Sequence, residues 1–394
     1  MPMSTMHPAS PAAAGFAPKT RIAVSLLFLM NGFVMGSWVP KIPEFKDRLG
    51  VSEGVLGLLV LAFGIGSLLL MPVAGALSAK LGSRQVTLVS GVFLTPMLLV
   101  MTFVPNLWTG FLGMVALGAF LGAMDVAMNA NAIEVEKSMR RAIMSSCHAF
   151  WSLGGVLGAG VGGITMGSLG ITAHAVIVTI IAALMLAIAW PITLRDAPHP
   201  ETKKEKLSLP KTLLPWLVGI MALFSMVPEG AVLDWSALYL RNELGASVAF
   251  SGFAFAAFSA TMCIMRFAGD LVRDRLGAVR TLRVSAAFAL VGMLTAGFAG
   301  TAWLAILGFA VAGIGIANMV PIAFSAAGNM PGLQPGIGLS VVTFMGYSGI
   351  LVAPSVIGFV AEHIGFGVVY ASLPVLFIVV LLLSHHAAHA DRKH

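Results

Sequence analysis

The sequence predicts an all-α integral membrane protein with twelve transmembrane helices in two similar halves. Hydrophobic residues make up 58% of the 394-residue chain and charged residues only 10%, and the mean hydropathy is +0.95. A water-soluble domain carries more charge on its surface than this. Apolar runs long enough to cross a hydrocarbon core of about 30 Å recur along the chain, and none alternates polar and apolar residues as a barrel strand would.

A helix needs about 20 residues to cross the hydrocarbon core, and twelve apolar runs of about this length or more are present. In chain order they cover residues 21–40, 55–77, 85–105, 107–133, 143–167, 171–194, 212–238, 249–271, 280–301, 303–328, 334–361 and 366–386. We expect each run to form one helix across the membrane.

The distribution of basic residues predicts the orientation, because Lys and Arg near span ends stay on the cytoplasmic side. With the N-terminus inside, nineteen of the 23 basic residues fall in inner segments, and only Lys41, Lys46, Arg48 and Arg241 fall outside. We therefore expect a multi-pass protein of the bacterial inner membrane with both termini in the cytoplasm. The net charge of +7 follows from this topology and does not require a nucleic-acid partner.

An internal repeat divides the chain. At a shift of 195 residues, LGVS (49–52) falls on LGAS (244–247), AKLG (79–82) on DRLG (274–277), LGAFLGAM (117–124) on AGIGIANM (312–319) and SLGGVLGAGVGG (152–163) on YSGILVAPSVIG (347–358). The predicted organisation is a disordered cytoplasmic N-terminal tail (1–20), a six-helix half (21–194), a polar linker (195–211), a second six-helix half (212–386) and a cytoplasmic C-terminal tail (387–394). We expect a monomer.

This layout resembles the major facilitator superfamily over essentially the whole chain. GALSAKLGSR (75–84) is similar to the family's G-x-L-S-D-R-x-G-R-R loop, with Ala79 in place of the acid, and RFAGDLVRDRLGAVR (266–280) is its second-half counterpart. The resemblance implies the family's fold and a cytoplasmic gate built from these two loops. Its candidate residues are Gly75, Lys80, Gly82, Arg84, Arg266, Asp270, Asp274, Arg275 and Gly277.

Asp125 lies well inside the fourth run, where ionising a carboxylate costs several kcal/mol unless something compensates. Asn129 follows one helical turn later, and the two form a polar stripe that should face a water-filled cavity. The alternative is a packing cluster in which Asp125 only hydrogen-bonds its neighbours. Glu134 and Glu136 lie beside Lys137, Arg140 and Arg141, where we expect interfacial ion pairs.

The stretch from Asp125 to Gly155 resembles one branch, the fucose-permease-like sugar:proton symporters. That branch carries an acid followed by A-A-N, matched by Asp125, Ala127 and Asn129, and an amide at the position of His148. The resemblance implies that Asp125 binds and releases the driving proton. A carboxylate withdrawn from water can exchange protons near neutral pH, and His148 could share the proton or be a packed side chain. The branch has a second acid in its first helix, whereas residues 21–40 contain no Asp or Glu.

The seventh run, SMVPEGAVLDWSALYL (225–240), supplies Glu229 as a second proton-coupling or substrate-binding candidate. Pro228 and Gly230 predict a break in this helix, which membranes tolerate where the backbone lines a cavity. Asp234, nearer the outer surface, is expected to pair with Arg241.

Aromatic and amide side chains suit the same pocket, since rings stack on sugars and amides bind hydroxyls. The substrate-binding candidates are Asn31, Trp38, Asn129, Trp151, Trp235, Asn318 and Tyr347. Trp residues near span ends are alternatively interfacial anchors. Arg266 lies near the cytoplasmic end of the eighth run, where a gate pair with Asp270 and Asp274 explains it. No Lys or Arg is therefore expected at mid-membrane. Sites for strongly anionic solutes usually contain such a base, so these solutes are not expected as substrates.

These observations predict a secondary transporter that moves a small, polar, neutral solute, sugar-like or polyol-like, by alternating access with proton symport. Protons and the lipid bilayer are its expected partners, and no cofactor or metal site is expected. The alternative is proton-driven efflux of drugs or amphipathic metabolites, which the 23 methionines would fit. A transporter-like sensor or a membrane enzyme fits less well, because no soluble domain or catalytic cluster is apparent.

Overall fold

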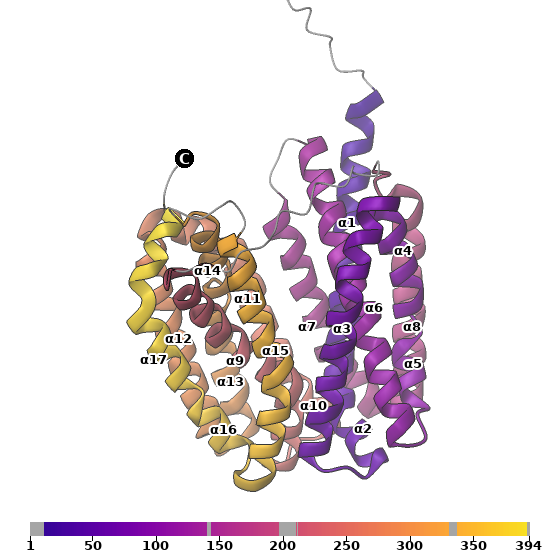
Figure 1. Cartoon of the computed structure of the whole chain (residues 1–394). Helices are drawn as coiled ribbons and strands as arrows, with labels where there is room; N and C mark the ends of the chain where they lie inside the picture. Colours follow the sequence, from indigo (N-terminus) through magenta and orange to yellow (C-terminus); the bar gives the residue numbers. More distant parts are fainter. Residues whose placement is uncertain (1–11, 140–142, 197–209, 211, 331–336, 392–394) are drawn as a thin grey trace, which may run out of the picture.

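The computed structural model is a bundle of long helices arranged as two halves that lie side by side (Figure 1). It describes residues 12–139, 143–196, 210, 212–330 and 337–391. Twelve helices within this part of the chain are long and apolar enough to cross a membrane, and the regular elements there are all helical. The prediction of an all-α protein with twelve membrane helices is confirmed.

The first half contains spans one to six. Its elements are α1 (Ala12–Trp38), η1 (Val39–Lys41), α2 (Ile42–Leu49), α3 (Glu53–Leu81), α4 (Ser83–Leu94), α5 (Met97–Thr102), α6 (Leu107–Met139), α7 (Met144–Leu169) and α8 (Ile171–Ile192). Prolines mark two of the joints within spans: Pro40 opens the short η1, and Pro96 precedes α5. Proline is tolerated there because the first helical residues need no N–H partner.

The second half contains spans seven to twelve. Its elements are α9 (Leu214–Asn242), α10 (Val248–Ser251), α11 (Phe253–Leu276), α12 (Ala278–Gly297), α13 (Ala302–Ile316), α14 (Met319–Gly328), α15 (Ile337–Ile364), α16 (Phe366–Ser372), α17 (Pro374–Leu383) and η2 (Ser384–Asp391).

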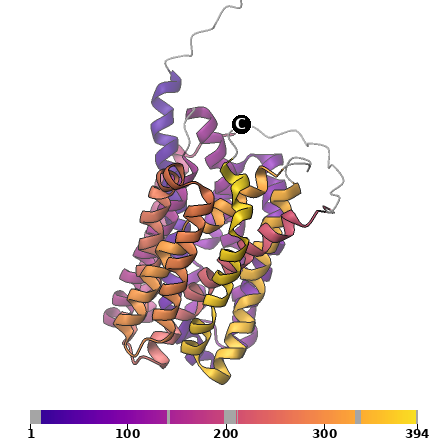
Figure 2. The same ribbon diagram turned by 90° about the vertical axis from the view of Figure 1, so that its left-hand side faces the viewer.

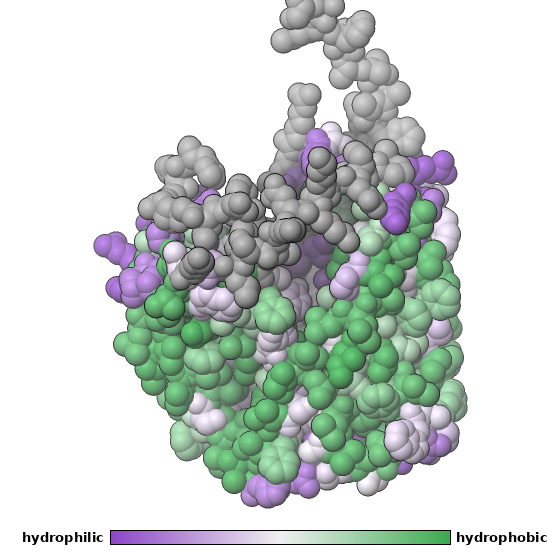
Figure 3. All heavy atoms as spheres, in the orientation of Figure 1, coloured by the Kyte–Doolittle hydropathy of each residue, from purple (hydrophilic) through white to green (hydrophobic). Residues whose placement is uncertain are grey.

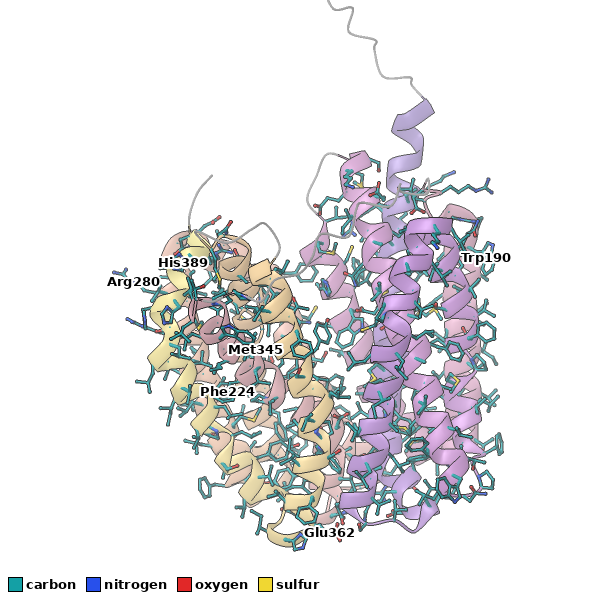
Figure 4. The ribbon with its side chains drawn as sticks, viewed as in Figure 1. Trp190, Phe224, Arg280, Met345, Glu362 and His389 are labelled. Carbon is teal, nitrogen blue, oxygen red and sulfur yellow. The ribbon has the colours of Figure 1, made fainter. Side chains whose placement is uncertain are left out.

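Both described ends of the chain lie at the same end of the bundle, here called the terminal end; the opposite end is the distal end (Figures 1 and 2). Arg280 and His389 lie at the terminal end and Glu362 at the distal end (Figure 4). Helix extends into both segments that were predicted as tails. Helix α1 begins at Ala12, and η2 continues to Asp391 with Ala387 and Ala390 buried. Residues 197–209, most of the expected linker, lie outside the described residues.

The sides of the bundle are apolar, and hydrophilic residues gather at its two ends (Figure 3). Large side chains such as Trp108, Phe298 and Leu69 expose 79%, 76% and 68% of their surface. An apolar surface of this kind suits a hydrocarbon environment. Figure 3 also shows a recess between the two halves near the terminal end.

Six glycines with positive φ show that the repeat extends to the backbone. They fall into three pairs, Gly50 with Gly245, Gly82 with Gly277 and Gly170 with Gly365, with φ angles of 62° and 65°, 89° and 75°, and 87° and 85°. The two members of every pair are 195 residues apart, the same shift as the sequence repeat. Each glycine joins two helices, and glycine adopts this left-handed conformation without steric cost.

The helix break predicted in the seventh span is wrong. Helix α9 runs without interruption from Leu214 to Asn242, with Pro228 inside it. The tenth span is broken instead, between α13 and α14, where Asn318 precedes the second piece. A proline inside a membrane helix need not break it when neighbouring helices satisfy the freed backbone groups.

Helix α7 packs against both halves through glycines on two faces. A Cβ on Gly158 would lie 2.4 Å from the Phe33 carbonyl oxygen of α1, and one on Gly163 would lie 2.8 Å from the Ala249 carbonyl oxygen of α10. Such close approach requires residues without a side chain. The glycine-rich run therefore holds α7 tightly to α1 and lets it meet the second half at the distal end.

The two halves are closed against each other toward the distal end. Arg241 of α9 binds Glu44 of α2, with Nη1 and Oε1 2.5 Å apart. The Gly54 N–H donates to Glu362 over 2.9 Å, and the Ser355 hydroxyl donates to the Gly57 carbonyl over 3.1 Å, so α3 and α15 are also joined. Within the described residues, the halves are therefore joined at the distal end, and the recess between them lies toward the terminal end.

Candidate functional site

An arginine and a glutamate of the second half meet at the middle of the bundle. Glu229 is the sixteenth of the 29 residues of α9, and Arg266 the fourteenth of the 24 residues of α11. Their side chains pair at 3.3 Å between Oε1 and Nη2, and only 24% and 18% of their side-chain surface is exposed. Glu229 is thus brought to the centre of the molecule together with a base.

Arg266 also joins the two halves. Its Nη1 donates to the Ser152 hydroxyl of α7 over 2.9 Å. The Ser259 hydroxyl donates to the Ser152 carbonyl over 2.9 Å, one to two turns of α11 nearer the distal end. Arg266 was expected at the end of its helix, in the gate, whereas its pair with Glu229 places it beside the sixteenth of the 29 residues of α9. Helix α11 continues to Leu276, five residues past the predicted end at 271. The side chain of Asp270 lies outside the described residues.

The first half contributes Asp125 and Asn129, one turn apart on α6. The Asn129 amide nitrogen lies 2.8 Å from the Asp125 carbonyl oxygen and 3.3 Å from its carboxylate Oδ1. Both residues are half-buried. The predicted polar stripe therefore exists as a hydrogen-bonded pair.

A second polar contact ties α7 to α1 and α6. The Trp151 indole N–H donates to Asn31 Oδ1 over 2.9 Å, and the Asn31 amide donates to the Leu121 carbonyl over 3.3 Å. Leu121 is one turn from Asp125, so Asn31 and Trp151 lie beside the Asp125 stripe. Asn31 is fully buried, and its side chain is held from both sides.

Tyr347 of α15 lies in the neighbourhood of both carboxylates. Its hydroxyl lies within electrostatic range of both Asp125 and Glu229. Helix α15 belongs to the second half and α6 to the first, so this site contains groups from both halves. The central site is here defined as Asn31, Asp125, Asn129, Trp151, Ser152, Glu229, Arg266 and Tyr347.

His148 lies at the edge of this set. Its ring packs edge-on against Phe28 with centroids 5.3 Å apart, and it lies within electrostatic range of Arg266. In the described part of the chain, no hydrogen bond joins His148 to Asp125. The predicted Asp–His relay is thus not formed in this conformation.

Three predicted substrate ligands lie elsewhere. Trp38 is buried near the distal end against Phe45, with ring centroids 5.2 Å apart, and Trp235 packs on Phe366 at 5.4 Å. Asn318 sits at the α13–α14 break, where a Cβ on Gly269 would come within 2.2 Å of its Oδ1. Among the described residues, no hydrogen bond or ring contact links these three side chains to Asp125 or Glu229.

The predicted gate loops form the joints α3–α4 and α11–α12, built around Gly82 and Gly277. Asp196, which follows α8, accepts hydrogen bonds from the backbone N–H groups of Ser83 over 2.6 Å and Arg84 over 3.1 Å. Asp391 accepts from the Ala278 N–H over 2.7 Å. Asp196 and Asp391 are again 195 residues apart, and sequence analysis missed both.

The other gate candidates have separate surroundings. Arg84 donates to the Trp190 carbonyl over 2.9 Å, and Gly75 faces Val126 of α6. Asp274 and Arg275 are exposed, and Lys80 lies at the end of α3. Arg273, which was not a candidate, pairs with Asp391 at 3.5 Å.

Two further expectations concern acids at the interface with water. Glu134 pairs with Lys137 at 2.7 Å, as predicted. Glu136 accepts hydrogen bonds from the backbone N–H groups of Ile143 and Met144, at the start of α7, over 2.7 and 3.2 Å. Its expected partners Arg140 and Arg141 lie outside the described residues. Arg241 pairs with Glu44 and Asp47, not with Asp234 as expected, because α2 brings both acids to it from the other half.

Comparison with solved structures supports the same architecture. A D-xylose-proton symporter superposes with a TM-score of 0.74 at 14% identity, covering 94% of this chain and 97% of that chain. The E. coli fucose:proton symporter gives a TM-score of 0.63 at 18% identity, covering 93% and 98%. At these identities the likeness shows the fold.

Sequence comparison identifies the family. The profile of the Major Facilitator Superfamily matches residues 24–332 and 218–393. An uncharacterized MFS-type transporter of Yersinia pestis is 34% identical over 368 residues, which cover 91% of this chain and 94% of that protein. The chain is a multi-pass membrane transporter, not an enzyme, and belongs to the major facilitator superfamily.

Proposed function

We propose that this transporter moves a small, polar, neutral solute, sugar-like or polyol-like, by symport with protons. One observation carries the proposal: Glu229 and Arg266 of the second half pair at the middle of the bundle, and Arg266 also binds Ser152 of the first half. A site shared by two halves changes its geometry when they rock, which is the requirement for alternating access. The structural neighbours described as xylose- and fucose-proton symporters support the class of substrate.

Asp125 is the proposed proton carrier. Its carboxylate has one amide donor, Asn129, at 3.3 Å and no cationic partner within 4.0 Å among the described residues. Glu229, in contrast, is paired with Arg266. The two acids thus take different roles: Asp125 exchanges the proton, and Glu229 holds Arg266 in place.

Arg266 is compatible with a neutral solute. Its charge is compensated by Glu229, and its other hydrogen bond goes to Ser152. The paired groups present hydrogen-bond donors and acceptors to hydroxyls without a net charge. The Trp151 ring, whose N–H is already bound to Asn31, supplies an apolar face beside them.

We further propose that the terminal end faces the cytoplasm of a bacterial cell, with the protein in the inner membrane as a monomer. Basic residues at the terminal end, among them Arg84, Arg195, Arg275, Arg280 and Arg283, support this orientation. The closed distal end then faces outward, and the structure represents the inward-open state.

The test is proton-gradient-driven uptake of labelled neutral sugars and polyols into proteoliposomes by the native protein and by Asp125→Asn. Accumulation should rise as the outside becomes more acidic than the inside, because inward proton movement drives it. Asp125→Asn should abolish accumulation while counterflow exchange survives, and Glu134→Gln, at an interfacial pair on the same helix, should behave as the native protein. Equal accumulation by Asp125→Asn would refute the assignment.

A further inference from the structure

A separate cavity lies at the distal end of the first half. Its volume is about 360 Å³, and it is lined by Trp38, Lys41, Glu44, Phe45, Asp47, Arg48, Met101, Thr102 and Ile171. These residues come from α1, η1, α2, α5 and α8. None of them belongs to the central site.

Lys41 is buried in the wall of this cavity, with 3% of its surface exposed. Its ammonium donates to the Thr102 hydroxyl over 2.8 Å, and that hydroxyl donates in turn to the Leu98 carbonyl. An ammonium has three donors, and among the described residues no carboxylate lies within 4.0 Å of this one. A buried cation with one neutral acceptor is costly unless an anion compensates it.

The nearby acids are already used by the other half. Glu44 and Asp47 pair with Arg241 of α9 at 2.5 and 3.8 Å. Arg48, at the rim, donates to the Met101 carbonyl over 2.6 Å. Three bases, Lys41, Arg48 and Arg241, thus lie near two carboxylates that both pair with Arg241, so the charge of this group of residues is positive.

His174 is an independent sign of a missing partner. Only 1% of its surface is exposed, and neither ring nitrogen has a hydrogen-bond partner in the described residues. It lies one turn after the cavity-lining Ile171 and is within electrostatic range of Lys41. A Cβ on Gly162 would lie 2.9 Å from its Nε2 and 3.6 Å from the Pro40 side chain, so His174 and Pro40, which precedes Lys41, face the same glycine of α7. A neutral imidazole has one N–H donor, which an anion beside Lys41 could accept.

We propose that this cavity binds a small monovalent anion between Lys41, Arg48 and His174, and that the bound anion favours the closed distal end. Lys41 and Arg241 compete for Glu44. When the anion compensates Lys41, Glu44 remains free to hold Arg241, and the halves stay joined. The anion is a free halide or the phosphodiester of a lipid headgroup; both carry one negative charge.

The first measurement uses delipidated protein in detergent. Its melting temperature in sodium bromide is compared with that in sodium gluconate at equal ionic strength. Bromide should raise the melting temperature by about 2–4 °C, since a ligand that binds only the folded state stabilises it. Lys46→Met is the matched control, because Lys46 at the same end is already paired with Glu53 at 2.9 Å. It should keep the bromide effect, and Lys41→Met should lose it.

Two further variants sharpen the test. Arg241→Gln frees Glu44 for Lys41 and should weaken bromide binding about tenfold. Thr102→Val removes the acceptor that Lys41 has among the described residues and should enlarge the bromide effect. This variant keeps the test informative if Lys41→Met does not fold. In crystals grown in bromide, the anomalous signal should lie next to Lys41.

Melting temperatures in phosphatidylglycerol nanodiscs and in phosphatidylcholine nanodiscs then distinguish a lipid headgroup from a free halide as the source of the anion. A rise with phosphatidylglycerol but not with bromide assigns the site to a lipid phosphodiester. Absence of both effects in the native protein, or an undiminished bromide effect in Lys41→Met, overturns the proposal. Loss of proton-driven uptake in Asp125→Asn is a separate result and does not bear on this cavity.

Discussion

The carboxylate of Glu229 lies 3.3 Å from the guanidinium of Arg266, and the same guanidinium binds Ser152 of the other half at 2.9 Å. Breaking one partner of a buried pair costs more than replacing both, because the remaining charge is left without compensation. Arg266→Met should therefore lower the free energy of unfolding by about 1–3 kcal/mol. Adding Glu229→Gln should recover part of this loss.

Thermal melts of the two single variants and the double variant in one detergent measure this coupling as a double-mutant cycle. If the losses of the single variants simply add in the double variant, the pair does not act as a unit. Lys137→Met, which breaks the interfacial pair with Glu134, is the control and should change stability by less than about 1 kcal/mol.

Arg241 should control how the distal end opens. Its pairs with Glu44 and Asp47 join α9 to α2, so Arg241→Gln removes contacts that exist only when the distal end is closed. Loss of about 1 kcal/mol shifts the ratio of the two states about fivefold. Cys263 reports the shift, since it is half-buried at the α7–α11 contact and should become less accessible when the terminal end closes.

The measurement is the rate of alkylation of Cys263 in a Cys147→Ala background. Arg241→Gln should slow it about fivefold, and Lys46→Gln, whose pair with Glu53 lies within the first half, should leave it unchanged. An equal rate in all three proteins would show that the Arg241 pairs do not hold the halves together.

Asp196 and Asp391 should stabilise their halves equally. Each accepts hydrogen bonds from N–H groups at the start of a helix, α4 or α12, and the negative charge also suits the positive helix end. Each change to Ala should cost about 0.5–2 kcal/mol, and each change to Asn should cost less. Melting temperatures of the four variants test this; a cost at only one of the two positions would contradict the functional equivalence of the repeat.

Gly158 and Gly230 provide a matched pair of glycine substitutions. A Cβ on Gly158 would meet the Phe33 carbonyl oxygen at 2.4 Å and the Ser37 nitrogen at 2.5 Å, whereas a Cβ on Gly230 meets nothing within 4 Å. Gly158→Ala should reduce the yield of folded protein strongly. Gly230→Ala should stabilise α9 by about 0.5–1 kcal/mol, because Gly in a helix interior is disfavoured relative to Ala. Size-exclusion profiles and melts give both outcomes.

The sequence predicted the fold well because membrane helices follow from length and apolarity alone. The repeat was also visible in the sequence, and the pairs of left-handed glycines in the structure have the same shift of 195 residues. Helix ends were less predictable: α11 ends at Leu276 and not at the expected 271. The pair of Arg266 with Glu229 was not predicted, because it depends on how α9 and α11 pack.

The central site was predicted in part. Asp125, Asn129 and Glu229 are charged or amide residues inside apolar runs, and each stands out in the sequence without any knowledge of its neighbours in space. Ser152, Glu44 and Arg241 gave no such signal, because their role depends on contacts between distant helices. Asp196 and Asp391 could have been found in the sequence. Each is an acid that follows the last span of its half, and the two are 195 residues apart, which is the shift of the repeat.

The three pairs of left-handed glycines have a mechanical consequence. Each pair fixes the same corner between helices in both halves, so the angles within a half are set by backbone geometry and not by side chains that differ between the halves. The corners can therefore stay as they are when the halves move relative to each other. In the proposed alternating access, the contacts that change are those between the halves, such as Arg241 with Glu44 and Arg266 with Ser152.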